Sequence, residues 1–401
     1  MRTLVVSDLH LGCAACPGLF AGADALASLL AELGPAPLRV VLNGDTFDFP
    51  AQAGAGGDAA SAMRSFVEDA EGAQLLARLG RIVAAGGELI VRAGEHDCEL
   101  VEPAVQALVV RGLELARTDE RRVVFHARRA LLLRVGGARV LVARRADGRG
   151  DASRWLAEHL LNPLRRQYGV GLADLLRPDY AGAVLAAFAV NPIAAKLVLR
   201  QLELEIDRAP PQLRAAFAGA GLSEREARVV AVALDPDAVL GPLDYEVLQH
   251  ARRKLFRHSL GRRVAPRDGL RAIVDREWDA LRSAARRRRA TAWLIGHSHI
   301  AGWRDEDGLV VADTGAWSLS IDPPPSSDVH AWRRRLDAWQ RITRIDRLDA
   351  IQAAGAGVSA RFTAAMIDPL AAEGGARLVL GECRPGRRLV ALRERRLPPG
   401  P

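Results

Sequence analysis

The chain has 401 residues and a mass of 43.1 kDa, which suffices for one large core with an insertion or for two domains. A hydrophobic content of 49% beside 26% charged residues is typical of a soluble globular protein, and four cysteines in this length exclude a disulfide framework. The formal net charge of +8 favours an anionic partner, such as a phosphate compound, an acidic lipid surface or a nucleic acid. A predicted strand begins at once after Met1, without the charged and apolar regions of a signal peptide, so we expect a cytoplasmic protein.

The first third of the chain alternates predicted strands with predicted helices. Short apolar runs at residues 4–7, 39–43 and 88–92 indicate strands, and longer periodic stretches at residues 23–33 and 60–79 indicate helices. This alternation is typical of an α/β sheet. Three further strands, the last two joined by a Gly-Gly turn, are predicted at residues 123–125, 130–135 and 139–142.

From residue 151 to residue 289 the pattern changes to one predicted helix after another. Ser223 and Glu226 form a capping box at the start of one of them, because their side chains can satisfy the first unpaired backbone N–H groups of the helix. Strand patterns return at residues 291–295 and 309–312. We therefore predict one α/β domain that is interrupted by a large helical insertion.

The predicted organisation has four parts. A first core segment covers residues 1–150, the helical insertion or cap covers residues 151–289, the rest of the core covers residues 290–322, and an extension covers residues 323–401. The extension begins with an amphipathic helix at residues 332–351 and continues into a predicted hairpin. The apolar face of that helix could rest on a membrane surface, but docking on the protein's own sheet is the favoured interpretation.

Four short polar segments each follow a predicted strand. Loops at the ends of such strands gather on one side of an α/β sheet, where binding sites form. Carboxylate oxygens together with imidazole nitrogens suit Mn, Fe or Zn. Asp-x-His alone would indicate a turn with a structural histidine, Gly-Asp-x-x-Asp alone is similarly weak, and Gly-His-x-His is moderately specific, whereas all four in this order indicate a site. The segments are Asp8-Leu-His10, Gly44-Asp45-Thr-Phe-Asp48, Gly94-Glu95-His96-Asp97 and Gly296-His297-Ser-His299.

Together the four segments resemble the motifs of the calcineurin-like metallophosphoesterase superfamily. The resemblance covers about the first 150 residues and residues 291–317, where Thr314-Gly-Ala-Trp317 is similar to a strand that follows the last motif. Within the superfamily the spacing is loosely similar to that of the UDP-diacylglucosamine hydrolases. The resemblance implies an α/β fold in which two mixed β-sheets pack as a sandwich flanked by helices, with residues 151–289 as a large helical insertion.

The resemblance also implies the ligands of two metal ions. A first metal would be held by Asp8, His10, Asp45 and His299, and Asp45 would bridge to a second metal that His297 also binds. Mn is the expected ion, with Fe, Zn and Mg as alternatives. A hydroxide between two such ions attacks phosphorus, because the ions generate the nucleophile and neutralise the phosphate together.

Three residues are implied in proton transfer. His96 would protonate the leaving oxygen as the general acid, a role that an imidazole fills near neutral pH. Asp97 or Asp48 would fix the tautomer of His96 by accepting its other ring proton. The reaction that the resemblance implies is therefore the hydrolysis of a phosphoester.

Two positions depart from the family pattern, and both concern the second metal. Glu95 stands where the family has an asparagine ligand, and no histidine follows the strand at residues 139–142, where the chain has Arg144 and Arg145. His126 lies one strand earlier, where a lone histidine is usually structural. Either arginine could pair with Glu95 in place of the second metal and hold a substrate phosphate. Glu95 could also ligate a metal itself, or the two changes could be independent drift.

Three functions compete. The leading prediction is a metal-dependent phosphodiesterase or other phosphoester hydrolase that acts on a small or lipid-linked phosphoester, with peripheral contact to an anionic membrane as an open alternative. The altered second-metal ligands favour a non-catalytic or weakly active scaffold that retains one metal. A nuclease, and nucleic acid as a partner, is the least favoured, because no basic groove interleaved with aromatic residues is evident.

Overall fold

The computed structural model of the chain divides into two compact units. Unit 1 comprises Met1–Gly148, Pro266–Ser318 and Ala360–Pro401, and unit 2 comprises Arg149–Ala265 and Leu319–Ser359. The residues that the structure describes are 1–12, 22–34, 37–52, 58–128, 130–144, 162, 185–186, 188–190, 218–234, 239–263, 269–296, 299, 301–317, 319–321, 328–341, 358–371, 374–384 and 386–400.

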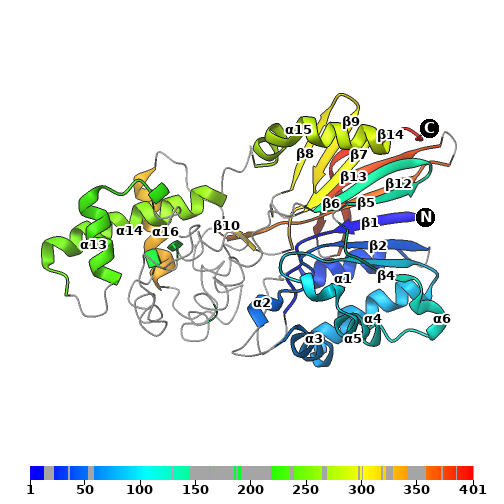
Figure 1. Ribbon diagram of the computed structural model, residues 1–401, viewed down its shortest axis with the longest axis horizontal. Helices are drawn as coiled ribbons and strands as arrows, with labels where there is room; N and C mark the ends of the chain where they lie inside the picture. Colours follow the sequence, from blue (N-terminus) through cyan, green and yellow to red (C-terminus); the bar gives the residue numbers. More distant parts are fainter. Residues whose placement is uncertain are drawn as a thin grey trace. The chain divides into compact units, whose positions relative to one another are not determined.

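A seven-stranded mixed sheet forms the larger layer of unit 1 (Figure 1). The first four strands of the chain run parallel to one another, and three antiparallel strands continue the sheet on the other side of β1. In spatial order the strands are β14 (Arg387–Leu397), β13 (Ala376–Arg384), β12 (Phe362–Pro369), β1 (Arg2–Val6), β2 (Leu38–Asn43), β3 (Glu88–Arg92) and β4 (Val123–His126).

A five-stranded mixed sheet forms the second layer of unit 1. β6, β7 and β9 are parallel, whereas β5 and β8 are antiparallel edge strands. The two sheets share one buried core, in which Val5, Val41 and Ile90 of the larger sheet pack with Val140 and Leu294 of the smaller sheet. In spatial order the strands are β5 (Ala130–Val135), β6 (Ala138–Arg144), β7 (Ala292–Gly296), β9 (Leu309–Asp313) and β8 (Gly302–Glu306).

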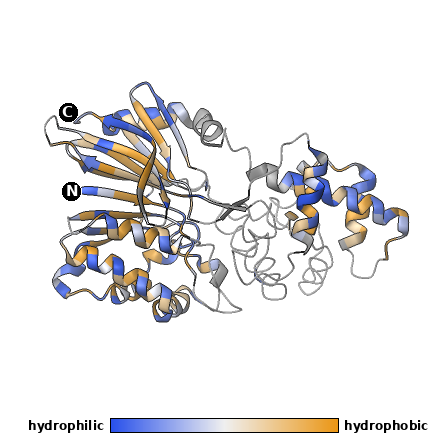
Figure 2. Cartoon of the chain, turned by 180° about the vertical axis from the view of Figure 1, so that it is seen from behind, coloured by the Kyte–Doolittle hydropathy of each residue, from blue (hydrophilic) through white to orange (hydrophobic). Residues whose placement is uncertain are grey.

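Amphipathic helices cover the outer faces of both sheets. In Figure 2 the helices of this unit alternate hydrophobic and hydrophilic residues, as expected when one side of a helix is buried. Asp58 and Asp69 begin two of them, because their carboxylates accept hydrogen bonds from the first backbone N–H groups. The helices that share a core with the larger sheet are α1 (Ala23–Glu32), α2 (Phe49–Gln52), α3 (Ala59–Glu68), α4 (Ala70–Ala84) and α5 (Pro103–Gly112), with the short turns η1 (Cys98–Val101) and α6 (Arg117–Glu120) along the same stretch.

The smaller sheet is covered by α15 (Gly269–Arg288). Trp278 and Ala285 of this helix pack on Leu309 and Val311 of β9. The predicted fold class is thereby confirmed, since two mixed β-sheets form a sandwich flanked by helices. The sequence pattern predicts α15 as part of the helical insertion, whereas its contacts place it in unit 1.

The C-terminal extension contributes to the larger sheet itself. The predicted hairpin is present as β13 and β14, and β12 joins it to β1 through antiparallel pairs such as Leu4 with Met366. The physical reason is that β1 would otherwise leave an open edge of unpaired backbone groups. A hairpin pattern can be read locally, but the strand that it pairs with cannot.

Unit 2 is helical over most of its described residues, which include α13 (Glu224–Leu234), α14 (Pro242–Arg263) and α16 (Val329–Arg341). The amphipathic helix of the extension, which we expected on a sheet, packs instead on α14 (Pro242–Arg263), where the Trp332 ring meets the Phe256 ring edge-on at 6.2 Å between centroids. The apolar face of α16 therefore packs on an aromatic residue of unit 2. β10 (Leu319–Ile321) and β11 (Val358–Ala360) form a short two-stranded sheet. Among the described residues, no helix combines the length and the apolar character that crossing a membrane requires.

Candidate metal centre

The candidate ligands follow strands at one edge of the sandwich. Asp8 and His10 follow β1, Asp45 follows β2, His96 follows β3, and His299 follows β7. These are the carboxyl ends of parallel strands in both sheets, where loops converge.

Strained backbone marks the same loops. The φ angles of Asp8, His10, Asp45 and His299 are 54°, 49°, 50° and 60°. A residue other than glycine adopts positive φ only when the surrounding structure holds it there, and such residues cluster at functional sites. At these turns the side chains no longer alternate in direction as they do along a strand.

Backbone hydrogen bonds lock the first two loops together. The Asp8 N–H donates to the Gly44 carbonyl at 3.1 Å, and the His10 N–H donates to the Asp45 carbonyl at 2.9 Å. The Trp317 N–H donates to the Asp8 carbonyl at 3.2 Å, and this bond attaches the loop after β9 to the same turn. The backbone of Asp8 is therefore held from both sheets, and that of His10 from the loop after β2.

Two glycines permit the close approach of these loops. A Cβ atom on Gly94 would lie 2.2 Å from the Asp45 Oδ1 atom, and one on Gly296 would lie 2.8 Å from the Asp8 Oδ2 atom. No larger residue fits at either position without moving a candidate ligand. These two motif glycines are thus required by packing at the site.

Asp8, His10 and His299 form one group that could hold a metal ion, and all three side chains are buried. The Nε2 atoms of His10 and His299 are 2.9 Å apart, and the Asp8 Oδ1 atom is 3.5 Å from the His299 Nε2 atom. Two ligand atoms bound to one ion at about 2.1 Å lie roughly 3.0–3.4 Å apart in octahedral or tetrahedral geometry. The separations and the mixed nitrogen and oxygen donors therefore fit a divalent cation.

The protonation states also suit metal binding. Burial, followed by the charges of His96 and His299, lowers the pKa of His10 from 6.5 to about 3. Burial alone would raise the pKa of Asp8, but the hydrogen bond and the charge of His299 outweigh it and lower that pKa below its ordinary value. At neutral pH the centre accordingly offers a neutral imidazole and an ionised carboxylate, which are the forms that bind metals.

A second group shares His10 and adds Asp48 and His96. The Asp48 Oδ1 atom lies 3.1 Å from the His96 Nδ1 atom, and its Oδ2 atom lies 4.0 Å from the His10 Nδ1 atom. The rings of His10 and His96 meet edge-on with their centroids 4.7 Å apart. Asp48 thus stands between the two imidazoles, and it contacts the ring that we predicted to be the general acid.

Asp97, the other predicted partner of His96, is used for a different contact. Its Oδ2 atom accepts hydrogen bonds from the backbone N–H groups of Thr46 at 2.7 Å and Phe47 at 3.1 Å. Its Oδ1 atom accepts a short hydrogen bond from the Gly94 N–H. These bonds tie the loop after β3 to the loop after β2, so Asp97 shapes the site through the backbone.

Asp45 and Glu95 belong to neither group of described ligand candidates. Asp45 is fully buried, and its Oδ1 atom accepts a hydrogen bond from the His96 N–H at 2.9 Å. Glu95 lies half-buried in the turn between Gly94 and Asp97. The bridging role of Asp45 and the metal-binding role of Glu95 remain predictions.

Three predicted residues lack a described side chain. His297 and Arg145 lie outside the described residues. Arg144 ends β6 opposite Gly296 in the strand register, which places its backbone at the site's edge, and its side chain lies outside the described part. The pairing of either arginine with Glu95 therefore stays a hypothesis.

The sequence reasoning missed a layer of buried polar residues beneath the loops. Asn43, Arg92 and Asp313 end β2, β3 and β9, and none is more than 2% exposed. Each directly follows at least three apolar residues of its strand. That switch from apolar to polar within one strand is the signal that could have identified them.

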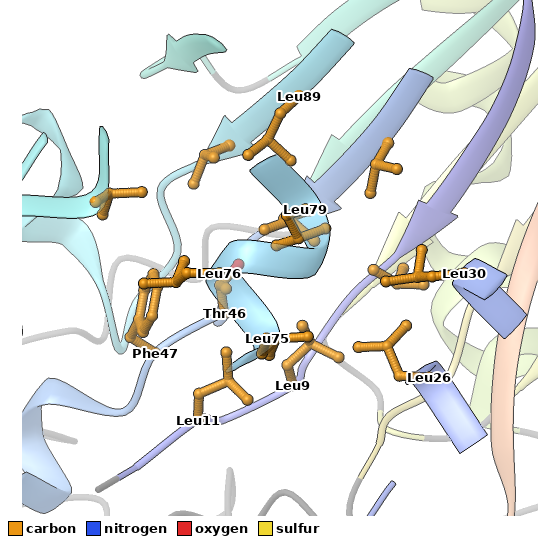
Figure 3. Close-up of a pocket in the computed structure, with 15 residues that line it drawn as sticks. Leu9, Leu11, Leu26, Leu30, Thr46, Phe47, Leu75, Leu76, Leu79 and Leu89 are labelled. Carbon is orange, nitrogen blue, oxygen red and sulfur yellow. The ribbon is translucent and has the colours of Figure 1, made fainter. Parts of the chain in front are cut away.

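Two cavities among the described residues of unit 1 have no candidate ligand in their lining. The cavity in Figure 3 has a volume of about 10 Å³ and lies within the core between helices and the larger sheet, where Leu9, Leu26 and Leu76 line it and Thr46 supplies the labelled oxygen. A more open hollow of about 320 Å³ includes Arg2, at the amino end of β1. The first has room for about one water molecule and is a feature of packing.

Comparisons with known proteins were made by family model, by sequence and by structure. No family model matches the chain, and no curated protein matches it. Among solved structures the chain is similar to a phosphopantetheinyl hydrolase from Mycobacterium tuberculosis, with 16% sequence identity, a TM-score of 0.29, and coverage of 83% of this chain and 92% of that chain.

Proposed function

We propose that the protein is a metal-dependent phosphoester hydrolase whose metal is held by Asp8, His10 and His299. The observation that carries the proposal is the convergence of three buried donor atoms at ligand separations, directly beside the Asp48–His96 pair. Metal ligands next to a carboxylate-oriented imidazole are the components of metal-assisted hydrolysis.

Manganese is the first ion to test, because a site of one carboxylate and two imidazoles suits Mn, Fe or Zn better than the all-oxygen sites of Mg. A divalent cation in this position supplies Lewis-acid activation of water and neutralises charge on a phosphate. Asp45 would complete the set from the neighbouring loop, since its charge acts on both Asp8 and His10.

His96 would donate a proton to the leaving oxygen. Asp48 accepts a hydrogen bond from the Nδ1 side of the ring at 3.1 Å, which fixes the orientation of the ring. The proton for the leaving oxygen would then come from the Nε2 atom. An acid placed in this way contributes about 10²- to 10⁴-fold to a rate. The edge-on contact with His10 places this proton donor next to a metal ligand, so one phosphoester could reach both.

The proposed substrate is a small or lipid-linked phosphoester. The net charge of +8 favours an anionic compound, and Arg144 and Arg145 are the proposed phosphate contacts. The helical insertion is proposed to act as a cap that selects the substrate.

A scaffold that binds one metal without turnover is the second candidate. It is favoured by Glu95 in the third motif and by Arg144 and Arg145 where a histidine ligand would be expected. Loss of a second ion would remove half of a two-metal clamp and slow the reaction.

Hydrolysis assays separate the two candidates. The Mn²⁺-loaded protein is given bis(4-nitrophenyl) phosphate and 4-nitrophenyl phosphate, with His96→Gln as the matched variant that keeps the proposed ligands. If the protein is a hydrolase, it should turn over at least one of the two esters, and His96→Gln should lower the turnover rate by about 10²-fold or more. Metal binding without turnover of either ester would support the scaffold, and turnover that His96→Gln leaves unchanged would contradict the assigned proton donor.

A further inference from the structure

The last residues of three neighbouring strands stand side by side beneath the candidate centre. Arg92 ends β3, and the strand registers place it between Asn43 of β2 and His126 of β4. Arg92 is 2% exposed and Asn43 is 1% exposed. A guanidinium stays charged in proteins, so Arg92 is a permanent cation inside the fold.

The Arg92 guanidinium connects three segments of the chain. One of its terminal nitrogens donates a short hydrogen bond to the Asn43 side-chain oxygen, and the other donates to the Arg128 carbonyl at 2.9 Å. The Asn43 side-chain nitrogen in turn donates to the Ala143 carbonyl of β6 at 3.2 Å. One series of hydrogen bonds therefore runs from the loop after β4, through the ends of β3 and β2, to the smaller sheet.

The residues that follow β2 and β3 belong to the candidate centre. Two residues after Asn43 comes Asp45, and four residues after Arg92 comes His96. The two loops are bonded to each other, since the His96 N–H donates to the Asp45 Oδ1 atom at 2.9 Å and Asp97 accepts from the loop after β2. A shift of either strand end would consequently move both loops.

Stability alone does not explain a buried arginine at this position. Taking a charge out of water costs several kcal/mol, and well-packed apolar residues often serve a core as well or better. Two positions earlier on the same strands, Val41 and Ile90 belong to the apolar core between the sheets. The change from these buried apolar residues to buried polar ones therefore occurs where the strands enter the candidate centre.

We propose that Arg92 is a positioning residue of the metal centre, which holds Asp45 and His96 in place through Asn43 and through the loop after β3. This inference depends on the metal centre proposed above. The charge of Arg92 also acts on its other neighbour, because burial, followed by the charges of Arg92 and Arg128, lowers the pKa of His126. His126 is in neither group of ligand candidates among the described residues.

Metal binding tests this role independently of turnover. Arg92→Met removes the charge and the donors but keeps a long side chain, and Arg92→Lys keeps the charge without the planar fork. Arg252→Met is the matched control, since Arg252 is 5% exposed and also donates to backbone carbonyls, those of Ala189 and Val190, but within unit 2. For each variant we measure Mn²⁺ affinity by calorimetry, the absorption spectrum of the Co²⁺ form, and the melting temperature of the metal-free protein.

We expect Arg92→Met to weaken Mn²⁺ binding about 10- to 100-fold, the usual effect of removing a residue that orients metal ligands. Arg92→Lys should lose less affinity and still alter the Co²⁺ spectrum. Arg252→Met should lower the melting temperature and leave both metal readouts unchanged. If Arg92→Met does not fold, Arg92→Lys and Asn43→Ala take its place, and each is expected to weaken Mn²⁺ binding.

Two negative results have different meanings. Wild-type affinity and spectrum in the Arg92 variants, even with a lower melting temperature, would show that Arg92 is structural only and overturn this inference. Failure of the wild-type protein to bind Mn²⁺, Fe²⁺, Zn²⁺ or Co²⁺ would overturn the metal centre itself.

Discussion

His10 and His299, which are 289 positions apart in the sequence, bring their Nε2 atoms within 2.9 Å of each other. His10 follows β1 of the larger sheet, and His299 follows β7 of the smaller sheet. The pair therefore exists only when the two sheets are packed together. A cation bound by both rings would in return stabilise the sandwich, because it binds the folded chain and has no preformed site in the unfolded one.

The first prediction concerns that link between metal and fold. Mn²⁺ at a hundredfold excess over its dissociation constant should stabilise the protein by about 2.7 kcal/mol. His299→Ala should abolish most of this gain and reduce bound Mn²⁺ by at least about tenfold. Thermal unfolding with and without Mn²⁺, together with metal analysis, measures both effects. The control is His250→Ala, which removes a histidine whose side chain is 59% exposed in unit 2 and should behave as wild type.

The second prediction separates Asp48 from the metal. Asp48→Asn keeps the shape of the side chain but removes the charge that faces His96 at 3.1 Å. We expect kcat to fall about 10²-fold while Mn²⁺ content stays near the wild-type value, because Asp48 orients the proton donor. In the double variant with His96→Gln the two losses of kcat should not add, because both substitutions remove the same function, proton donation by His96. Additive losses would contradict the assigned pair.

The sequence was sufficient for the fold class and for the residues that gather at one edge. Asp8, His10 and His299 could be predicted because each motif follows a strand, and the rule for loops at strand ends is independent of the details of packing. The choice between Asp48 and Asp97 as the partner of His96 could not be predicted from the sequence. Both residues belong to motif loops, and only their side-chain contacts distinguish them.

The missed features share a physical cause. Nothing local indicates that β12 pairs with β1, or that α16 packs on α14, because these contacts join segments far apart in the chain. Arg92 was overlooked for a similar reason. An arginine at a strand end is usually solvated, and its burial depends on the neighbouring strands on both sides.

The third prediction tests the close packing of the loops. Gly94→Ala places a Cβ atom 2.2 Å from the Asp45 Oδ1 atom and 2.3 Å from its backbone nitrogen. The backbone of the loop after β2 has to move, so we expect weaker Mn²⁺ binding and a loss of stability of about 1–3 kcal/mol. Calorimetry and urea unfolding measure the two effects. Gly241→Ala is the control, because its nearest atom is an Asp244 side-chain oxygen at 3.8 Å, and it should change neither.

The fourth prediction is that acid destabilises the metal-free protein through His10. Burial, followed by the charges of His96 and His299, lowers the pKa of His10 from 6.5 to about 3. Between these values the unfolded chain binds a proton that the folded chain does not, so this stability is complete above pH 6.5 and is lost as the pH falls towards 3. Asp8 acts in the same direction but only below its unfolded pKa of 3.8. The urea concentration at the unfolding midpoint of the metal-free wild type should therefore be lower at about pH 5 than at about pH 7. His10→Gln should make this difference smaller. The exposed His250→Gln should retain it, whereas the same pH dependence in His10→Gln and wild type would show that His10 is not the group that titrates.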